Sequence, residues 1–212
     1  AGFVDGFDGS VSQVTMDFTD IDSVIAGDSS SDSLTGINAI GAWTVDEPGS
    51  YMADGESLAF SQFENLNGND DVDVFLIQDG GFALAGGDGD DTFNVTDGVT
   101  LTGTIDGGDH TTGDTLSFAM STRAIAFSAS LVTNVETIIG STPGDDTILG
   151  TDGDDAFEID GGDSGTVNGA IFNGFANLDG GLGNDSFQFT ADAGSLTGSV
   201  EGGSGMVTLG FN

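Results

Sequence analysis

Aspartates in glycine-rich turns are the residues of this chain whose types and spacing could support chemistry. Residues 86–94 read GGDGDDTFN and fit the nonapeptide pattern G-G-x-G-x-D-x-U-x, in which U is a large apolar residue. Residues 180–188 fit the pattern again, and residues 150–158 depart from it only at the second glycine. Glycine lets a turn point its carbonyl oxygens inward, and the adjacent carboxylates add negative charge. Such turns favour Ca²⁺, which takes hard oxygen ligands at flexible geometry.

Further copies of the nonapeptide occur along the chain. Residues 144–148 stand nine positions ahead of the equivalent residues 153–157, so these two copies are in tandem. Weaker copies lie at 68–75, at 107–116 with an insertion, and at 202–209, where Val207 replaces the aspartate. The motif therefore decays but keeps returning, which is typical of a repeat protein.

These nonapeptides resemble the calcium-binding RTX, or haemolysin-type, repeats. A longer pattern, F-x-x-F-x-N-L-x-G followed by the nonapeptide and L-T-G-x-[IV]-[DE]-G-G, is similar to the degenerate repeats of very large secreted bacterial adhesins and surface-filament proteins. The resemblance implies that turn carbonyls and sixth-position aspartates of stacked coils form an oxygen cage around Ca²⁺. The metal-binding residues that it implies are Asp88, Asp91, Asp146, Asp155, Asp185, Gly87, Gly89, Gly144, Gly153, Gly181 and Gly183. Because only residues 144–158 are clearly consecutive, we expect a few Ca²⁺ ions and not an unbroken row.

Two alternative interpretations require no metal. Aspartates in Gly-Asp turns also cap their own backbone, as ordinary turn residues do. An acidic surface can in addition be an adaptation to a salty environment, and solvated aspartates outside the motifs are compatible with either interpretation.

The other candidate reactive residues favour structural roles. A polysaccharide lyase would need Arg123 as its base, with no second cation to bind an acidic sugar, so we expect Arg123 to pair with a local carboxylate. His110 lies in an insertion and is expected to be an exposed loop residue. Trp43 and Tyr51 could form an aromatic sugar platform, but Trp43 aligns with the core-like Phe157. No nucleophile, base and orienting group can be assembled, which predicts a protein that is not an enzyme.

Short alternating segments connect the turns and predict half-buried strands. Phe157 and Ile159 flank Glu158, and Phe187 and Phe189 are spaced in the same way. Strand-turn-strand units of roughly 18 to 23 residues predict an all-β fold, a parallel β-helix or β-roll solenoid of about nine or ten short coils.

A longer repeat organises these units. Six residues recur 112 positions later: Phe60, Phe63, Asn65, Leu66, Gly68 and Phe75 recur as Phe172, Phe175, Asn177, Leu178, Gly180 and Phe187. Residues 101–108 recur at 196–203 with a displacement of only 95, so the first unit holds 17 extra residues near 75–93. An added coil is tolerated where repeats contact only their neighbours. We therefore expect one continuous solenoid with two super-repeats, residues 1–134 and the shorter 135–212.

Composition limits the classes of partner. The formal net charge is −35, with 36 Asp and Glu against one Arg, which argues against nucleic acid and against anionic membranes. The 37 glycines and the many aspartates disfavour helices, and no apolar run is long enough to span a membrane. The 16 phenylalanines favour a folded chain, and the absence of cysteine excludes disulfides.

Taken together, these features predict a secreted, calcium-stabilised structural solenoid of a bacterial adhesin or extracellular filament, located outside the cell or at its surface. The alternative is a calcium-binding RTX module of a secreted enzyme whose catalytic domain is not in this sequence. Strand pattern continues through residues 205–212 without a polar cap, so we expect end-to-end self-association or continuation in a longer parent chain. A surface or glycan target is a further expected class of partner.

Overall fold

The chain folds almost entirely into β-strands. The computed structural model describes residues 7–9, 18–28, 30–190 and 193–212. The one helix among them is the short 3₁₀ turn η1 (Ala129–Leu131), so the predicted lack of α-helix is confirmed for the described residues. Within this part of the chain there is no helix with the length and apolar character needed to cross a membrane.

The strands form four sheets. The largest has thirteen strands, in the order β24 (Thr208–Phe211), β22 (Ser186–Phe189), β18 (Ala156–Gly161), β19 (Ser164–Val167), β20 (Ala170–Asn173), β16 (Thr137–Ile139), β13 (Thr115–Ser117), β11 (Thr92–Val95), β9 (Asp73–Ile77), β5 (Gly41–Val45), β6 (Gly49–Ala53), β7 (Glu56–Ser61) and β3 (Ser23–Ile25). A five-stranded sheet has the order β15 (Val132–Thr133), β12 (Ile105–Asp109), β10 (Ala83–Asp88), β8 (Asn65–Asp70) and β4 (Ser33–Thr35). A four-stranded sheet contains β14 (Ala126–Ser128), β17 (Thr147–Leu149), β21 (Asn177–Asp179) and β23 (Val200–Glu201), and β1 (Phe7–Gly9) pairs with β2 (Phe18–Ile21).

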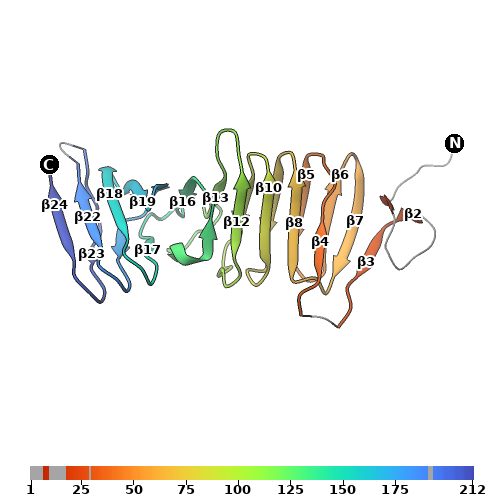
Figure 1. The fold of residues 1–212 in the computed structure, drawn as a ribbon, viewed down its shortest axis with the longest axis horizontal. Helices are drawn as coiled ribbons and strands as arrows, with labels where there is room; N and C mark the ends of the chain where they lie inside the picture. Colours follow the sequence, from red (N-terminus) through yellow and green to blue (C-terminus); the bar gives the residue numbers. More distant parts are fainter. Residues whose placement is uncertain (1–6, 10–17, 29, 191–192) are drawn as a thin grey trace.

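Successive strand pairs stack along the long axis of an elongated molecule (Figure 1). The chain passes from β8 to β9, from β10 to β11 and from β12 to β13, and each step crosses from the five-stranded to the thirteen-stranded sheet. Neighbouring strands in these stacks are parallel and in register. The prediction of an all-β chain with parallel sheets is confirmed.

Apolar side chains from equivalent strand positions form the core. Phe93 is paired in register with Phe75 on one side and with Leu116 on the other, and all three are fully buried. The Phe75 and Phe93 rings stack 4.8 Å apart, as do those of Phe157 and Phe187. Because Phe75 and Phe93 lie on adjacent strands, the 17 extra residues of the first unit correspond to one added strand pair.

Two antiparallel regions, each of three strands, interrupt the parallel stacking, which the sequence interpretation did not anticipate. Strands β5, β6 and β7 are antiparallel neighbours, and so are β18, β19 and β20. The turns at Asp54-Gly55 and Asn168-Gly169 have positive φ at both residues, as the tight turns of two-residue hairpins require. Phe60 on β7 and Phe172 on β20 both lie on the third strand of their antiparallel region, where each is paired with a glycine, Gly49 or Gly165.

The thirteen-stranded sheet continues across the predicted boundary between residues 134 and 135, because β13 pairs in parallel with β16. The five-stranded sheet, in contrast, ends at β15, just before this boundary. Phe175, which the repeat predicts to point inward, is fully buried and contacts Phe172 edge to face with ring centroids 6.4 Å apart.

Candidate metal centre

Six buried aspartates occupy the turns that lead into strands. Each stands at the first position of a strand or immediately before it, and none is more than 2% exposed; they are Asp73, Asp91, Asp114, Asp146, Asp155 and Asp185. Buried carboxylates are rare unless they are paired or hydrogen-bonded, so each of these side chains requires a compensating partner.

The first glycine of each nonapeptide makes room for the aspartate. A Cβ on Gly150 would lie 2.6 Å from Asp155 Oδ2, and a Cβ on Gly86 or Gly180 would overlap the carboxylate of Asp91 or Asp185. The spacing of five residues therefore has a packing cause, because the aspartate folds back over a residue that has no side chain.

The aspartates of the first half of the chain are linked from coil to coil. The Asp73 amide donates to Asp91 Oδ1 at 2.7 Å, the Asp91 amide donates to Asp114 Oδ1 at 2.7 Å, and the Asp114 amide donates to Glu136 Oε2 at 2.7 Å. The Trp43 indole adds a 3.0 Å hydrogen bond to Asp73 Oδ1. We call this row, Asp73, Asp91, Asp114 and Glu136, the corner ladder. In the second half the Asp155 amide donates to Asp185 Oδ1 at 3.0 Å.

The second carboxylate oxygen separates these aspartates into two groups. Within the described part of the chain, Oδ2 is buried without a hydrogen-bond partner in Asp73, Asp91, Asp114 and Asp185, and also in Asp32 of an earlier turn. In contrast, Asp155 Oδ2 accepts from the Thr151 amide at 2.8 Å. The Ser141 amide likewise donates to Asp146 Oδ2, and the Ser141 hydroxyl donates to Oδ1 at 2.7 Å.

Among the six aspartates, the residue after the first glycine differs between the two groups. Before Asp73, Asp91, Asp114 and Asp185 this residue has positive φ, at Asn69 (86°), Gly87 (108°), Gly108 (101°) and Gly181 (80°), whereas Asp28 in the turn before Asp32 does not. Its amide then serves another acceptor in two of these turns, since Asn69 N–H donates to Asn67 Oδ1 and Gly181 N–H donates to Asp179 Oδ1. Ser141 and Thr151 do not have positive φ, and their amides bind the aspartate.

Backbone carbonyls of the next coil lie on the same side as the unpartnered oxygens. The space that a Cβ on Gly86 would occupy is bordered by both Asp91 Oδ2 and the carbonyl oxygen of Gly107. At Gly68 the same space is bordered by Asp73 Oδ2 and the carbonyl oxygen of Gly86. Gly140 and Gly150 have the same kind of border, with Asp146 or Asp155 Oδ2 beside the carbonyl oxygen of Gly174 or Gly180. The missing donor is therefore what distinguishes the unpartnered carboxylate oxygens, and a proton or a cation would supply it.

Burial also shifts the protonation of these groups. Desolvation raises the pKa of Asp73 to about 7 and that of Asp91 to about 6, and the neighbouring carboxylates add to both shifts. Desolvation raises the pKa of Asp114 as well. A raised pKa is the response expected of a carboxyl group that lacks a compensating charge.

The tandem copies at residues 144–158 do not stack on each other. Asp146 precedes β17 of the four-stranded sheet, whereas Asp155 precedes β18 of the thirteen-stranded sheet. The stacked partner of Asp155 is Asp185, thirty residues away. Adjacency in sequence was therefore a poor guide to stacking, because the two consecutive copies lead into strands of different sheets.

The remaining residues implied by the RTX resemblance lie on the turns around these aspartates. Positive φ occurs at five of the six glycines, Gly87, Gly89, Gly144, Gly181 and Gly183, but not at Gly153. Asp88 is exposed at the end of β10. Asp73 and Asp114 were not among the implied ligands, although the weaker copies at 68–75 and 107–116 contained the signal.

Other candidate reactive groups occupy structural positions. Arg123 Nε pairs with Asp97 Oδ1 at 3.3 Å, as expected for a local ion pair. Trp43 is 1% exposed and stacks on Phe75 at 5.6 Å, and Tyr51 is 2% exposed, which leaves no exposed aromatic platform at these two residues. His110 lies on a loop, as predicted, where it contacts Asp114 and Glu136.

Comparison with known proteins found no matching family model, no matching curated protein and no matching solved structure. Of the six buried aspartates in the described residues, Asp73, Asp91, Asp114 and Asp185 keep an unpartnered Oδ2, as Asp32 does, whereas Asp146 and Asp155 have both carboxylate oxygens hydrogen-bonded.

Proposed function

We propose that this chain is a calcium-stabilised structural module, a parallel β-solenoid that belongs to a secreted bacterial adhesin or extracellular filament and is not an enzyme. One observation carries the proposal: buried turn carboxylates with unpartnered oxygens recur from coil to coil and converge with backbone carbonyls. A structural cation would neutralise such a row and stabilise the folded chain by binding only that state.

The parallel stacking supports the solenoid. Equivalent strands pair in register from β8 through β10 to β12, and the strands that follow them pair from β9 through β11 to β13. Each coil therefore contacts mainly its neighbours, which is how solenoids tolerate an added coil. The two antiparallel regions, β5–β7 and β18–β20, would be local insertions into this pattern.

The donor set supports Ca²⁺ at particular turns. Carboxylate and carbonyl oxygens are the ligands that Ca²⁺ prefers, and extracellular calcium modules bind it weakly enough to use the ambient ion. Asp91 and Asp185, from the two complete nonapeptides, would hold the ion together with turn carbonyls. Asp146 and Asp155, in contrast, would act as turn-capping residues, because local donors already fill their oxygens.

The role outside the cell rests on the adhesin-like repeat pattern and on charge. With a net charge of −35, the chain would repel other acidic surfaces and collect divalent cations. A long, rigid module of this kind would serve attachment or a fibre scaffold.

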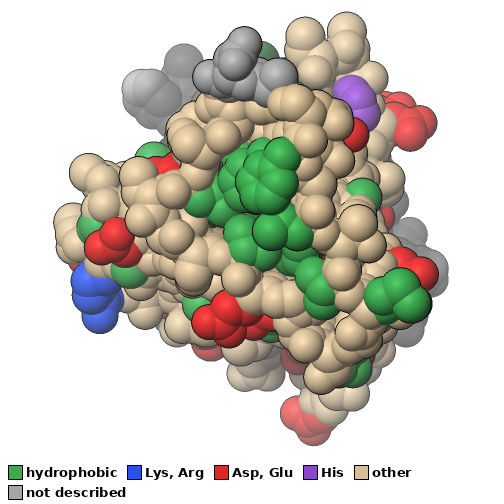
Figure 2. All heavy atoms as spheres, turned by 90° about the vertical axis from the view of Figure 1, so that its left-hand side faces the viewer, with side chains coloured by type: hydrophobic (Ala, Val, Ile, Leu, Met, Phe, Trp, Pro, Cys, Tyr) green, Lys and Arg blue, Asp and Glu red, His purple; other side chains and the backbone are tan. Residues whose placement is uncertain are grey.

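One end of the molecule supports association of modules. Strand β24 is the last strand of its sheet among the described residues, and Leu209 and Phe211 on it are 53% and 72% exposed. Figure 2 shows hydrophobic side chains gathered in the middle of this end face. A further coil, from a second copy or from the same polypeptide, would cover them. Light scattering across concentration tests association. A strictly monomeric protein would contradict covering of this end by a second copy.

Thermal unfolding tests the calcium proposal. The midpoint is expected to rise when millimolar Ca²⁺ replaces EGTA, by an amount equivalent to about 2.7 kcal/mol at a hundredfold excess over Kd. Sodium and magnesium salts at matched ionic strength are the controls, because charge screening alone would act similarly in all three. Equal midpoints in Ca²⁺ and in the matched salts would overturn the proposal.

A further inference from the structure

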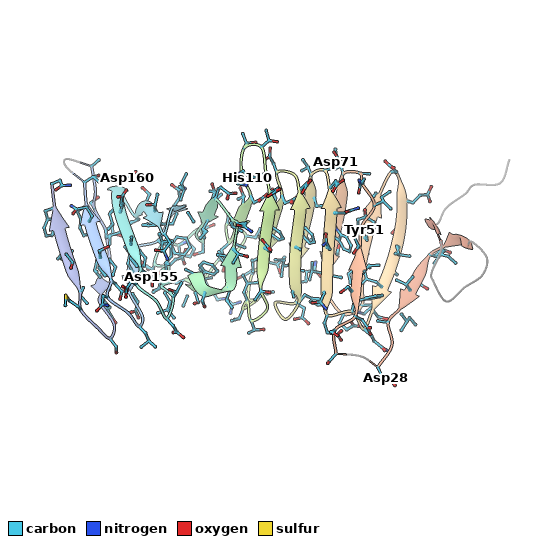
Figure 3. All side chains as sticks on the ribbon, in the orientation of Figure 1. Asp28, Tyr51, Asp71, His110, Asp155 and Asp160 are labelled. Carbon is cyan, nitrogen blue, oxygen red and sulfur yellow. The ribbon has the colours of Figure 1, made fainter. Side chains whose placement is uncertain are left out.

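One corner of the ladder differs from the others because its turn carries an insertion. Gly107 and Asp114 are seven positions apart, where Gly86 and Asp91 are five apart, and the longer turn carries the chain's single histidine. Figure 3 shows His110 on the loop that rises beyond the strands at this coil. The next residue of the ladder is also different, because Glu136 stands where the rest of the corner ladder has aspartate.

The inserted turn is held over the corner by a neighbouring carboxylate. Asp90 Oδ1 accepts from the amides of Thr111 at 2.9 Å, Thr112 at 2.7 Å and Gly113 at 3.1 Å. These bonds fix the backbone on the C-terminal side of His110. The loop is therefore preorganised without any contribution from the imidazole.

Three side chains converge at this point. His110 Nδ1 lies 3.2 Å from Glu136 Oε2 and 3.9 Å from Asp114 Oδ2, and one ligand atom from each lies within 4.8 Å of the other two. A tetrahedral ion with bonds of about 2.0 to 2.1 Å holds its ligands roughly 3.3 Å apart. The separation of His110 Nδ1 from Glu136 Oε2 is close to that value and its separation from Asp114 Oδ2 is longer, so side-chain rotations would be needed to bring all three atoms onto one ion.

The buried carboxylate gives an independent reason for a ligand. The Asp114 side chain is 0% exposed, and its Oδ2, which faces His110, has no hydrogen-bond partner among the described residues. The His110 and Glu136 side chains are 34% and 33% exposed, so the site is open on one side to an ion and to a water ligand. Two carboxylates would neutralise the charge of a divalent ion.

We infer that His110, Asp114 and Glu136 form a binding site for a divalent transition metal of the Zn²⁺ class, distinct in chemistry from the oxygen-only turns. The imidazole nitrogen is the reason, because nitrogen ligands favour Zn²⁺ and its first-row neighbours, whereas Ca²⁺ and Mg²⁺ prefer oxygen. The loop insertion and the replacement of aspartate by glutamate together create a site that the other corners lack.

The test is a calorimetric titration of the full chain with Zn²⁺ in excess Ca²⁺, which occupies oxygen-only sites. We expect a tight Zn²⁺ site whose affinity falls more than about tenfold in His110→Ala and in Glu136→Gln. Glu158→Gln, which removes an exposed carboxylate elsewhere, is the matched control and should bind as the unmodified chain does. Equal affinity in His110→Ala would overturn the inference.

Nuclear magnetic resonance of the imidazole keeps the inference testable in the unmodified chain. Because His110 is the only histidine, its nitrogen resonances are unambiguous. One equivalent of Zn²⁺ should shift Nδ1 into the range of a metal-bound nitrogen, and unmoved resonances would mean that His110 only pairs with Glu136. The response of the melting midpoint to Ca²⁺ should persist in His110→Ala, so this site and the calcium proposal can fail separately.

Discussion

The turn before Asp91 and the turn before Asp155 place the same residue type at the same depth but bind it differently. Both aspartates are at most 2% exposed, and both fold over the first glycine of a nonapeptide. Asp155 has its carboxylate filled by donors from Thr151 and Asn168, whereas Asp91 keeps an oxygen that no described group satisfies. Equal motif position therefore does not mean equal chemistry.

The second position of the nonapeptide, the one place where residues 150–158 depart from the pattern, contributes to the difference. Gly87 has a φ of +108°, and a Cβ there would overlap the backbone of Asn69 in the adjacent coil. Thr151 has no such conformation, and its amide and hydroxyl both reach the aspartate. A second glycine thus leaves the carboxylate available to a cation, while threonine makes the turn self-sufficient.

The largest expected effect tests whether the two regions share one core. Phe93→Ala and Phe157→Ala should each cost about 3 to 5 kcal/mol of unfolding free energy, since both rings are stacked and buried and their loss leaves cavities. Denaturant titration in chelator and in Ca²⁺ should give the same loss in both conditions. If the two variants lose clearly different amounts of unfolding free energy, the two regions differ in packing and not only in their turns.

The sharpest test exchanges one carboxylate oxygen for an amide in each turn. Asp155→Asn should destabilise by about 1 to 3 kcal/mol in chelator, because its new NH₂ would face a donor. Asp91→Asn should be neutral or stabilising there, because its NH₂ could donate toward the Gly107 carbonyl while Oδ1 keeps the Asp73 amide.

Calcium should reverse the order within this pair of variants. Asp91→Asn should lose much of the rise in midpoint that Ca²⁺ produces, and Asp155→Asn should retain it. Chemical denaturation with and without EGTA measures both variants. If Asp91→Asn and Asp155→Asn both destabilise the chain in chelator, the proposed difference between the two turns is wrong.

The smallest expected effect is a dependence of stability on pH in chelator. The folded-state pKa values of Asp73, about 7, and Asp91, about 6, lie above the ordinary value of 3.8, so the folded chain binds protons more tightly than the unfolded chain. The neighbouring carboxylates of Asp91 and Asp71 disfavour ionisation of Asp73. Those of Asp114 and Asp90 disfavour ionisation of Asp91 in the same way.

This contribution to stability is full below pH 3.8 and is lost as pH rises through 6 to 7. Between neutral pH and about pH 5, the midpoint in chelator should therefore increase on acidification, and Asp73→Asn should flatten the increase. A midpoint that falls steadily over that range would contradict the burial of unpartnered carboxylates.

Much of the fold could be read from local patterns. Alternation around Glu158 and Gln188 indicated strands, and both residues lie on strands. The unequal displacements of the repeats placed 17 extra residues near 75–93, and Phe75 and Phe93 are paired on neighbouring parallel strands. The hairpins were missed although Asp54-Gly55 and Asn168-Gly169 are strong turn signals, because their strands look like those of the parallel coils.

The candidate site was harder to predict. The sequence predicted Asp91, Asp146, Asp155 and Asp185 as equivalent calcium ligands, and all four are buried. Among these four, only Asp91 and Asp185 have an unpartnered carboxylate oxygen. Hydrogen-bond satisfaction depends on the φ of one residue and on amides that arrive from another coil. Neither is visible in a motif that counts only residue types.

The sequence by itself determined that the chain is rich in strands, strongly acidic and punctuated by turns in which glycine makes room for aspartate, because these properties depend on composition and on contacts within five residues. Only the tertiary structure decided which turns stack, since residues thirty positions apart, such as Asp155 and Asp185, become neighbours. It also decided that His110 meets Glu136, which lies on the following coil. Stacking along the axis sets which carboxylates find donors, and it is a property of the whole array and not of any single repeat.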